Sequence, residues 1–207
     1  EENSEESARR IPEIPKEPQL ADLEELKAYS LAAKGKHMIP FAYNVEDASL
    51  YGVNLADTYC YTILGPARSG KKNTLRALMA GVEQKEGECC IMEFSSSDFK
   101  RYGEKGKFTY VSTPKEMFDY WKGLTPIFIE RNQKKKQFLE QGFSEEEIFA
   151  EMKELFLPVF LFIADVADFF RTVYASNPNV GSMKGFVENI ISKGSLHNIY
   201  FIGALDT

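Results

Sequence analysis

The sequence has few cysteines, no long apolar run and no excess of basic residues. Three cysteines in 207 residues are an odd number and cannot complete a disulfide framework, which indicates a reducing, cytosolic compartment. The most apolar stretch, residues 155–164, contains Pro158 and is too short to span a bilayer. The acidic N-terminus lacks the basic and then apolar pattern of a secretory signal. We therefore expect no membrane contact by this chain itself.

The charge balance argues against nucleic acid as a ligand. Lys and Arg number 25 against 31 Asp and Glu, which gives a net charge of −6. Nine acids and four bases in the first 27 residues contribute −5 of this charge, so the remaining 180 residues are close to neutral. Binding a polyanion through bulk charge requires a basic face with many phosphate contacts. DNA is therefore not expected as a partner.

Composition and length predict one folded domain behind a linker. Hydrophobic residues make up 43% of the chain, which is enough for a sizeable core at this length. Residues 1–20 begin with an acidic polar segment and hold three prolines, which fix φ and remove backbone donors. We expect an extended linker over residues 1–20 and a domain over residues 21–207.

Within the domain, apolar strand patterns alternate with helical patterns. The strand patterns cover a hairpin at 38–55 and single strands at 59–64, 88–94, 108–112, 158–164 and 198–205. The helical patterns cover residues 21–34, the segment that follows the glycine-rich turn at 65–70, and residues 144–156, 165–174 and 182–193. Another long helical pattern runs from residue 114 to residue 142, and we expect it to be bent or broken near Pro126. This alternation predicts an α/β fold with a mainly parallel sheet covered on both faces.

The most informative segment follows the predicted strand at 59–64. It matches the phosphate-binding pattern G-x-x-x-x-G-K between a strand and a helix, which is the context that this motif requires. Its glycines let backbone N–H groups curl around phosphates at a helix N-terminus, and its lysine reaches the terminal phosphates. The candidate nucleotide-binding residues are Gly65, Pro66, Ala67, Arg68, Ser69, Gly70, Lys71, Lys72 and Asn73.

The position after Lys71 departs from this pattern. Phosphate loops place Ser or Thr there, because the hydroxyl coordinates Mg²⁺ between the β- and γ-phosphates. Lys72 has no lone pair for a cation, and its own charge repels one nearby. Alternatively, Lys72 points to solvent and water completes the metal shell. Thr74 lies on a different face of the helix and is a poor substitute, so we expect a weakened or absent metal site.

A second catalytic element is also altered. The apolar strand at 158–164 ends at Asp165, the position of an acid that contacts Mg²⁺ through water. ATP-hydrolysing motors with a phosphate loop usually place Glu directly after this acid, to polarise the attacking water. Here the next residue is Val166. Asp168 lies one helical turn further on, where we expect it to cap or solvate the helix start rather than act as a base. The two departures together predict lost hydrolysis.

Other residues with reactive side chains have structural interpretations. Cys89 and Cys90 are neighbours in a strand, so their side chains point to opposite faces and core packing is favoured over metal binding. His37 and His197 have no partner at metal-ligand spacing and are interpreted as structural. The basic run formed by Arg131 and residues 134–136 is expected on a solvated helix face, with contact to an acidic partner as the alternative.

Together these motifs resemble an FtsK/SpoIIIE-type ATPase domain, of the kind repeated in the type VII secretion ATPases EssC and EccC. The resemblance covers the hairpin before the phosphate loop, the loop itself and residues 158–170, which are similar to a strand followed by Asp-Glu-x-x-Asp-Leu with the glutamate replaced. At residues 193–195 the chain has Lys-Gly-Ser where DNA-pumping relatives have Arg-Gly-Arg, and Ala204-Leu205 stands where they have a polar sensor. Residues 10–15 resemble the proline-rich lead into a C-terminal domain of the secretion ATPases.

The resemblance implies a RecA-like P-loop NTPase fold, a three-layer αβα sandwich whose C-terminal part would lie beyond Thr207. It also implies a degenerate C-terminal module of a type VII secretion motor, the soluble part of a larger membrane protein at the cytoplasmic face of a bacterial cell membrane. Implied partners are neighbouring ATPase domains of the same polypeptide and small helical-hairpin (WXG100-type) export substrates, whose C-terminal signal such modules recognise.

On this interpretation ATP binds weakly or not at all, Mg²⁺ is not expected, and Asp165 is a remnant of the catalytic apparatus. Such a module would regulate the motor or recruit its substrates. One alternative is an active ATPase, in which Thr74 or water completes the Mg²⁺ shell and a neighbouring subunit contributes the missing groups. The other alternative is DNA translocation, which the acidic balance and the missing basic stretch disfavour.

Overall fold

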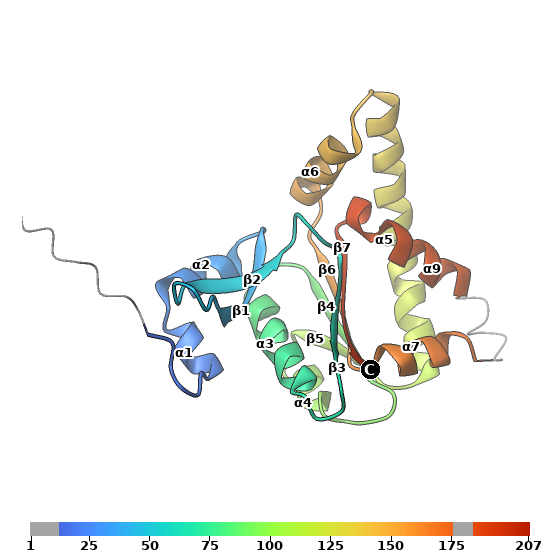
Figure 1. Ribbon diagram of the computed structural model, residues 1–207. Helices are drawn as coiled ribbons and strands as arrows, with labels where there is room; N and C mark the ends of the chain where they lie inside the picture. Colours follow the sequence, from blue (N-terminus) through green and yellow to red (C-terminus); the bar gives the residue numbers. More distant parts are fainter. Residues whose placement is uncertain (1–12, 176–183) are drawn as a thin grey trace, which may run out of the picture.

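The computed structural model describes residues 13–175 and 184–207, which form a central parallel sheet with helices on both faces (Figure 1). The strands lie in the spatial order β3-β7-β6-β4-β5, and each neighbouring pair is parallel. Their bounds are β3 (Cys60–Gly65), β4 (Glu88–Met92), β5 (Phe108–Val111), β6 (Val159–Ile163) and β7 (Ile199–Asp206). The predicted three-layer α/β fold with a mainly parallel sheet is confirmed.

Two apolar layers cover the sheet, one on each face. The first layer contains α3 (Lys71–Glu83) and α4 (Lys100–Glu104), and the second contains α5 (Pro114–Glu140), α7 (Val166–Val173) and α9 (Lys184–Lys193) (Figure 1). Cys89 packs in the first layer and Cys90 in the second, because successive side chains of a strand point to opposite faces. The structural interpretation of both cysteines is therefore confirmed.

The predicted hairpin is also confirmed. β1 (Met38–Tyr43) and β2 (Leu50–Asn54) pair antiparallel and form a small sheet of their own. This hairpin packs on α3, where a Cβ at Gly81 would come within 2.4 Å of the Pro40 carbonyl oxygen. Only glycine permits so close an approach of helix and strand. The packing fixes the position of α3, whose first residues belong to the phosphate loop.

The N-terminal part of the domain differs from the prediction of one helix over residues 21–34. Two short helices, α1 (Leu20–Glu24) and α2 (Lys27–Lys34), are separated at Leu26, whose ψ of 125° is extended. The break lets Leu23 and Tyr29 enter one small apolar cluster beside the hairpin. α2 ends before Gly35, as predicted. Residues 13–19 form no helix or strand, and the expected linker at residues 1–12 lies outside the described residues.

The expectation of a break near Pro126 is wrong, because α5 runs through this proline as one helix of 27 residues. Proline removes one backbone hydrogen bond, but apolar burial on both sides of it holds the helix together, with Trp121 before it and Phe138 after it. The predicted capping box at Ser144 and Glu147 is present at the start of α6 (Glu145–Leu155). In the part of the chain that is described, no helix is both long enough and apolar enough to cross a membrane.

Candidate functional site

The parallel sheet brings the predicted site residues to one edge. Parallel strands end on the same side, so the segments that follow β3, β4 and β6 meet the last residues of β7 at the carboxyl edge of the sheet. There they line a cavity of about 230 Å³. The residues that form its walls are Lys71, Lys72, Glu93, Phe94, Ser95, Ser96, Ala164, Asp165, Asp168, Ala204 and Asp206. The structure thus brings Lys71 and Lys72 together with Asp165, which the sequence placed on a separate element.

The glycine-rich loop has a geometry suited to anions. Arg68 (φ 64°) and Gly70 (φ 92°) adopt the left-handed conformation, and α3 begins directly after them at Lys71. Gly70 caps the helix without a side-chain acceptor, and no acidic residue lies in the first turn. The first N–H groups of α3 and its positive dipole end are therefore directed at the loop. A Cβ at Gly65 would lie 2.6 Å from the Ser69 Oγ, which explains the first glycine of the motif.

The loop lysine, Lys71, is engaged within the protein. Its Nζ donates to the carbonyl oxygens of Gly65 (2.7 Å) and Pro66, and it forms an ion pair with Asp206 Oδ1 at 2.6 Å. An anion in the loop must compete with the Asp206 carboxylate for this ammonium group. The other loop residues, from Pro66 to Gly70, are exposed, and Asn73 accepts a hydrogen bond from Arg76 (2.8 Å).

Asp206 was missed by the sequence analysis. The polar sensor position was assigned to Ala204-Leu205, but β7 extends to Asp206, which pairs in register with Gly65 at the end of β3. A carboxylate therefore stands beside the phosphate loop at the end of the neighbouring strand. The parallel register of two strands that are distant in sequence brings it there, and nothing in the local sequence pattern indicates that pairing.

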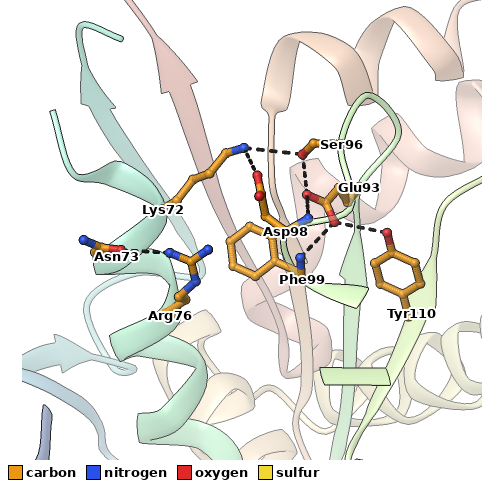
Figure 2. A network of polar contacts seen from close by, with 8 residues as sticks. All are labelled: Lys72, Asn73, Arg76, Glu93, Ser96, Asp98, Phe99 and Tyr110. Atoms are coloured by element: carbon orange, nitrogen blue, oxygen red, sulfur yellow. Dashed lines mark hydrogen bonds and ion pairs between the residues drawn. The ribbon is translucent and has the colours of Figure 1, made fainter. Parts of the chain in front are cut away.

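Lys72 does not point to solvent alone. Its Nζ forms an ion pair with Asp98 and lies 3.4 Å from the Ser96 Oγ (Figure 2). The hydrogen bond and the positive charge of Lys72 lower the pKa of the Asp98 carboxyl. Both partners belong to the segment between β4 and α4, which the sequence analysis did not single out. Thr74, the alternative metal ligand, does not line the cavity.

Glu93 organises this segment. The side chain is 2% exposed, and its carboxylate accepts hydrogen bonds from the Ser96 hydroxyl, the Asp98 N–H (3.0 Å), the Phe99 N–H (3.0 Å) and the Tyr110 hydroxyl (3.1 Å), as Figure 2 shows. Burial, and next the Glu93 charge, raise the pKa of Tyr110 to about 12. The sequence analysis placed Glu93 inside a strand. Its place at the carboxyl end of β4, at the same edge as the loop, is the signal that could have identified it.

The acids after β6 differ in part from the prediction. Asp165 lines the cavity as expected, and its Oδ1 caps α7 by accepting from the Asp168 N–H (2.9 Å). Asp168 is not the cap; it is buried and forms an ion pair with Arg171, which corrects the earlier expectation. Val166 packs against β7, since a Cβ at Gly203 would meet its Cγ2 at 2.5 Å. No proton-accepting group thus stands at the position after Asp165.

The site does not fit a magnesium ion. A phosphate loop holds Mg²⁺ through the hydroxyl that follows its lysine. Here that position carries the Lys72 ammonium group, which has donors but no lone pair and is held by Asp98. Among residues 13–175 and 184–207, no three His, Cys, Asp or Glu side chains are grouped so that they could hold a metal ion.

The basic run on α5 is only partly a solvated face. Arg131 is buried, and its guanidinium donates to the carbonyl oxygens of His197 (2.5 Å) and Leu157 (2.7 Å), which corrects the prediction for this residue. His197 is buried, stacks on Phe128 at 4.5 Å between ring centroids, and contacts the Lys193 carbonyl through Nδ1 at 2.8 Å. Burial lowers its pKa. The structural interpretation of His197 is confirmed.

A second, larger cavity of about 370 Å³ lies at the opposite, amino edge of the sheet. Its walls come from the segments that precede β4, β6 and β7 and from the end of α2. Leu157, Phe160 and Tyr200 are among the apolar wall residues, and Lys36, Lys85 and Lys153 are among the charged ones. Lys85 donates to the carbonyls of α2 and the following turn, and burial lowers its pKa to about 8. The sequence analysis did not identify this cavity.

Comparison with known proteins found no matching family model and no match among curated proteins. Solved structures, in contrast, match in fold. The cytoplasmic domain of EssC matches 95% of this chain with a TM-score of 0.76 at 14% identity, and EssC (ATPases 2 and 3) from Geobacillus thermodenitrificans matches 95% with a TM-score of 0.71 at 13% identity. The conjugation coupling protein TcpA of pCW3, solved with ATPγS, matches 87% with a TM-score of 0.61 at 12% identity.

Thermomonospora curvata EccC (ATPases 2 and 3), solved in complex with a signal sequence peptide, matches 84% of this chain with a TM-score of 0.59 at 14% identity. This chain spans 36% of the EssC cytoplasmic domain, 33% of the Geobacillus EssC chain, 50% of the TcpA chain and 30% of this EccC chain. It therefore has the fold of the ATPase domains of EssC and EccC, which confirms at the level of the fold the resemblance drawn from the phosphate loop and the strand before Asp165.

Proposed function

We propose that this chain is a degenerate P-loop ATPase module of a type VII secretion motor that binds nucleotide weakly or not at all. One observation carries the proposal: Lys71 and Lys72, two of the three cations among the candidate loop residues, are each neutralised by an internal carboxylate, Asp206 and Asp98. A nucleotide that contacts these lysines must break the internal ion pairs, so the lysines contribute less free energy to its binding.

The acids around the cavity do not supply a base for hydrolysis. A general base must be free to accept a proton from water within hydrogen-bond reach. Glu93 already accepts four hydrogen bonds, and Asp165 caps α7. Asp168 is paired with Arg171, and Asp206 with Lys71. The position next to Asp165 is filled by Val166, which packs on the sheet. This arrangement supports the loss of hydrolysis.

The proposed role is regulation or recognition of export substrates, and the cavity at the amino edge of the sheet supports the latter. Its apolar walls, with Leu157 exposed at 55%, can receive apolar side chains. Lys36 is paired with Glu154, and Lys85 donates to backbone carbonyls. Lys153 forms no ion pair in the described residues, so it can pair with a carboxylate of the same ligand. An apolar peptide segment that also carries acidic groups matches both properties. We assign the proposed partner to the small helical-hairpin (WXG100-type) export substrates, whose C-terminal signal would bind here.

The wider setting is proposed on the same basis. Two of the matching chains, one of EssC and one of EccC, hold ATPases 2 and 3, and this chain spans about a third of their length. Its proposed neighbours are ATPase domains of the same polypeptide, at the cytoplasmic face of a bacterial cell membrane. In the described residues no helix could cross a membrane, so any anchor would come from another segment.

Restoring the two missing groups tests the decayed site. The double variant Lys72→Thr with Val166→Glu supplies a metal-binding hydroxyl and a glutamate at the positions where active relatives carry them. We expect Mg²⁺-dependent phosphate release by the double variant, and none above background by the matched control Lys122→Thr with Val45→Glu, which changes exposed residues elsewhere. Turnover by the unaltered chain would instead support the alternative, an active ATPase.

Peptide binding tests the recognition role separately. A fluorescent peptide that copies the C-terminal segment of a WXG100-type protein is titrated with the chain and followed by anisotropy. Leu157→Asp should abolish binding, whereas Leu139→Asp, a similarly exposed leucine on α5 outside the cavity, should leave binding unchanged. Equal binding by both variants would refute the amino-edge cavity as the recognition site.

A further inference from the structure

The least ordinary feature of the phosphate site is the Lys72 side chain. It stands where the motif requires a metal-binding hydroxyl, and its ammonium group is directed toward Ser96 and Asp98 across the cavity edge (Figure 2). A lysine without partners at this position would extend into solvent. This one is held in place by two partners, although half of its surface is accessible.

The partners themselves are held by a buried group. Glu93 accepts the Ser96 hydroxyl and the Asp98 N–H with one carboxylate oxygen, and the Phe99 N–H with the other. Phe99 is fully buried, and Arg76 of α3 lies over its ring at 5.3 Å. The segment from Glu93 to Phe99 is thus anchored at both ends, and it presents a carboxylate and a hydroxyl to the start of α3. These contacts hold the partners of Lys72 in place and thereby position its side chain.

The ammonium group keeps capacity for a further ligand. It has three N–H donors, and Asp98 and Ser96 account for two of them. The third donor remains for an acceptor on the open side, where Lys71 and the first N–H groups of α3 also converge. A phosphate oxygen is the acceptor that suits an ammonium group and helix N–H groups together.

We propose that the Lys72 ammonium takes the place of the divalent cation, so that this site accepts a polyphosphate ligand free of metal. This inference rests on the weak nucleotide binding of the proposed function, and it adds that the nucleotide binds without a metal ion. A fixed ammonium group at the metal position supplies the phosphates with a hydrogen-bond donor and with the part of its charge that Asp98 leaves uncompensated. It has no lone pair to coordinate the Mg²⁺ that a nucleotide would bring with it. Lys72 is then a specificity-determining residue that selects metal-free over metal-bound phosphate chains.

Neighbouring carboxylates limit the affinity but do not reverse this preference. Four acids line the cavity and repel a phosphate chain, although Asp206 is paired with Lys71 and Asp168 with Arg171; they are Glu93, Asp165, Asp168 and Asp206. These acids would attract a metal ion, so the selection against Mg²⁺ depends on Lys72 itself. Replacing this one side chain should therefore reverse the metal preference, whereas a lysine lost elsewhere should not.

The experiment is a calorimetric titration of the chain with ATP, once in EDTA and once in excess Mg²⁺. The unaltered chain should bind ATP more tightly in EDTA, by at most about tenfold, because Asp98 offsets part of the repulsion between the ammonium group and a divalent ion a few ångströms away. Lys72→Thr should reverse this order, so that Mg²⁺ tightens binding. Lys122→Thr, which removes an exposed lysine on α5, should keep the order of the unaltered chain.

A second variant covers the case in which Lys72→Thr does not fold. Asp98→Asn leaves the lysine in place but removes the charge that neutralises it, so ATP in EDTA should bind more tightly than to the unaltered chain. Tighter binding with Mg²⁺ to the unaltered chain would overturn the inference, as would an unchanged metal preference in Lys72→Thr. Absence of ATP binding under both conditions would also overturn it, yet would agree with the proposed function. Mg²⁺-dependent binding accompanied by turnover would contradict both.

Discussion

Replacing Glu93 by Gln removes the charge at the centre of the loop beside the phosphate site while keeping the side-chain shape. Each carboxylate oxygen of Glu93 accepts one hydroxyl and one backbone N–H: Oε1 accepts from Ser96 and Asp98, and Oε2 accepts from Phe99 and Tyr110. The amide of Gln replaces one oxygen by an NH₂ group. Whichever oxygen is lost, one buried backbone N–H faces a donor and has no acceptor.

The magnitude follows from these contacts. The hydroxyl can rotate and accept from the new NH₂ group, but the backbone N–H cannot adjust. A hydrogen bond to a charged acceptor contributes about 1.5–3 kcal/mol, and the bonds that remain weaken as the charge disappears, so the loss in free energy of unfolding should be about 3 kcal/mol. For a chain of this size that loss lowers Tm by about 6–12 °C.

Guanidinium denaturation followed by circular dichroism measures the loss, and hydrogen exchange locates it. The amides of Asp98 and Phe99 should exchange faster in Glu93→Gln. The amides of β6 should remain protected, with exchange limited by global unfolding. Glu151→Gln, at an exposed position of α6, is the matched control and should change stability by less than about 0.5 kcal/mol. A loss below about 1 kcal/mol in Glu93→Gln, with both amides still protected, would refute the reasoning.

Three further predictions concern single charges. Asp206→Asn frees Lys71 from its ion pair and should tighten ATP binding about three- to fivefold in a calorimetric titration; weaker binding would contradict the competition between Asp206 and phosphate. Arg131→Met leaves the carbonyls of His197 and Leu157 without their donor and should cost about 2–4 kcal/mol in denaturant unfolding, whereas a near-neutral result would count against its structural role. Because burial lowers the pKa of Lys85 to about 8 in the folded chain, the unfolded chain holds more protons between pH 8 and the ordinary lysine pKa of about 10.4, and stability should rise with pH across that window. Lys85→Met should lose this rise, and an unchanged pH profile would show that Lys85 does not cause it.

Local patterns were sufficient to predict the elements that carry the site. The turn residues and the G-x-x-x-x-G-K spacing identify a strand, a loop and a helix without tertiary information, and β3 and α3 confirm them. The alternation of apolar strands with helices predicts a parallel sheet, which in turn places the loop and Asp165 at one edge. In these cases the sequence signal and the tertiary structure agree.

The sequence-based predictions are wrong where contacts between residues that are distant in the sequence determine the structure. Asp98 and Asp206 are ordinary surface acids in the sequence, and each becomes the partner of a loop lysine only through the packing of α3 beside β4 and β7. The sequence indicates that Arg131 is part of an exposed basic run, but its guanidinium donates to carbonyls at the amino edge of the sheet and is buried there. Pro126 predicts a helix break, but apolar burial of the residues around it keeps α5 intact.

We propose above that this phosphate site does not turn over ATP, because its lysines are paired with internal carboxylates and no base follows Asp165. The most direct test is the rate of phosphate release by the unaltered chain at saturating ATP and Mg²⁺, with a Lys71→Ala variant as the background control. The account predicts the same rate for both proteins. Release by the unaltered chain that exceeds the rate of Lys71→Ala, and that requires Mg²⁺, would contradict it.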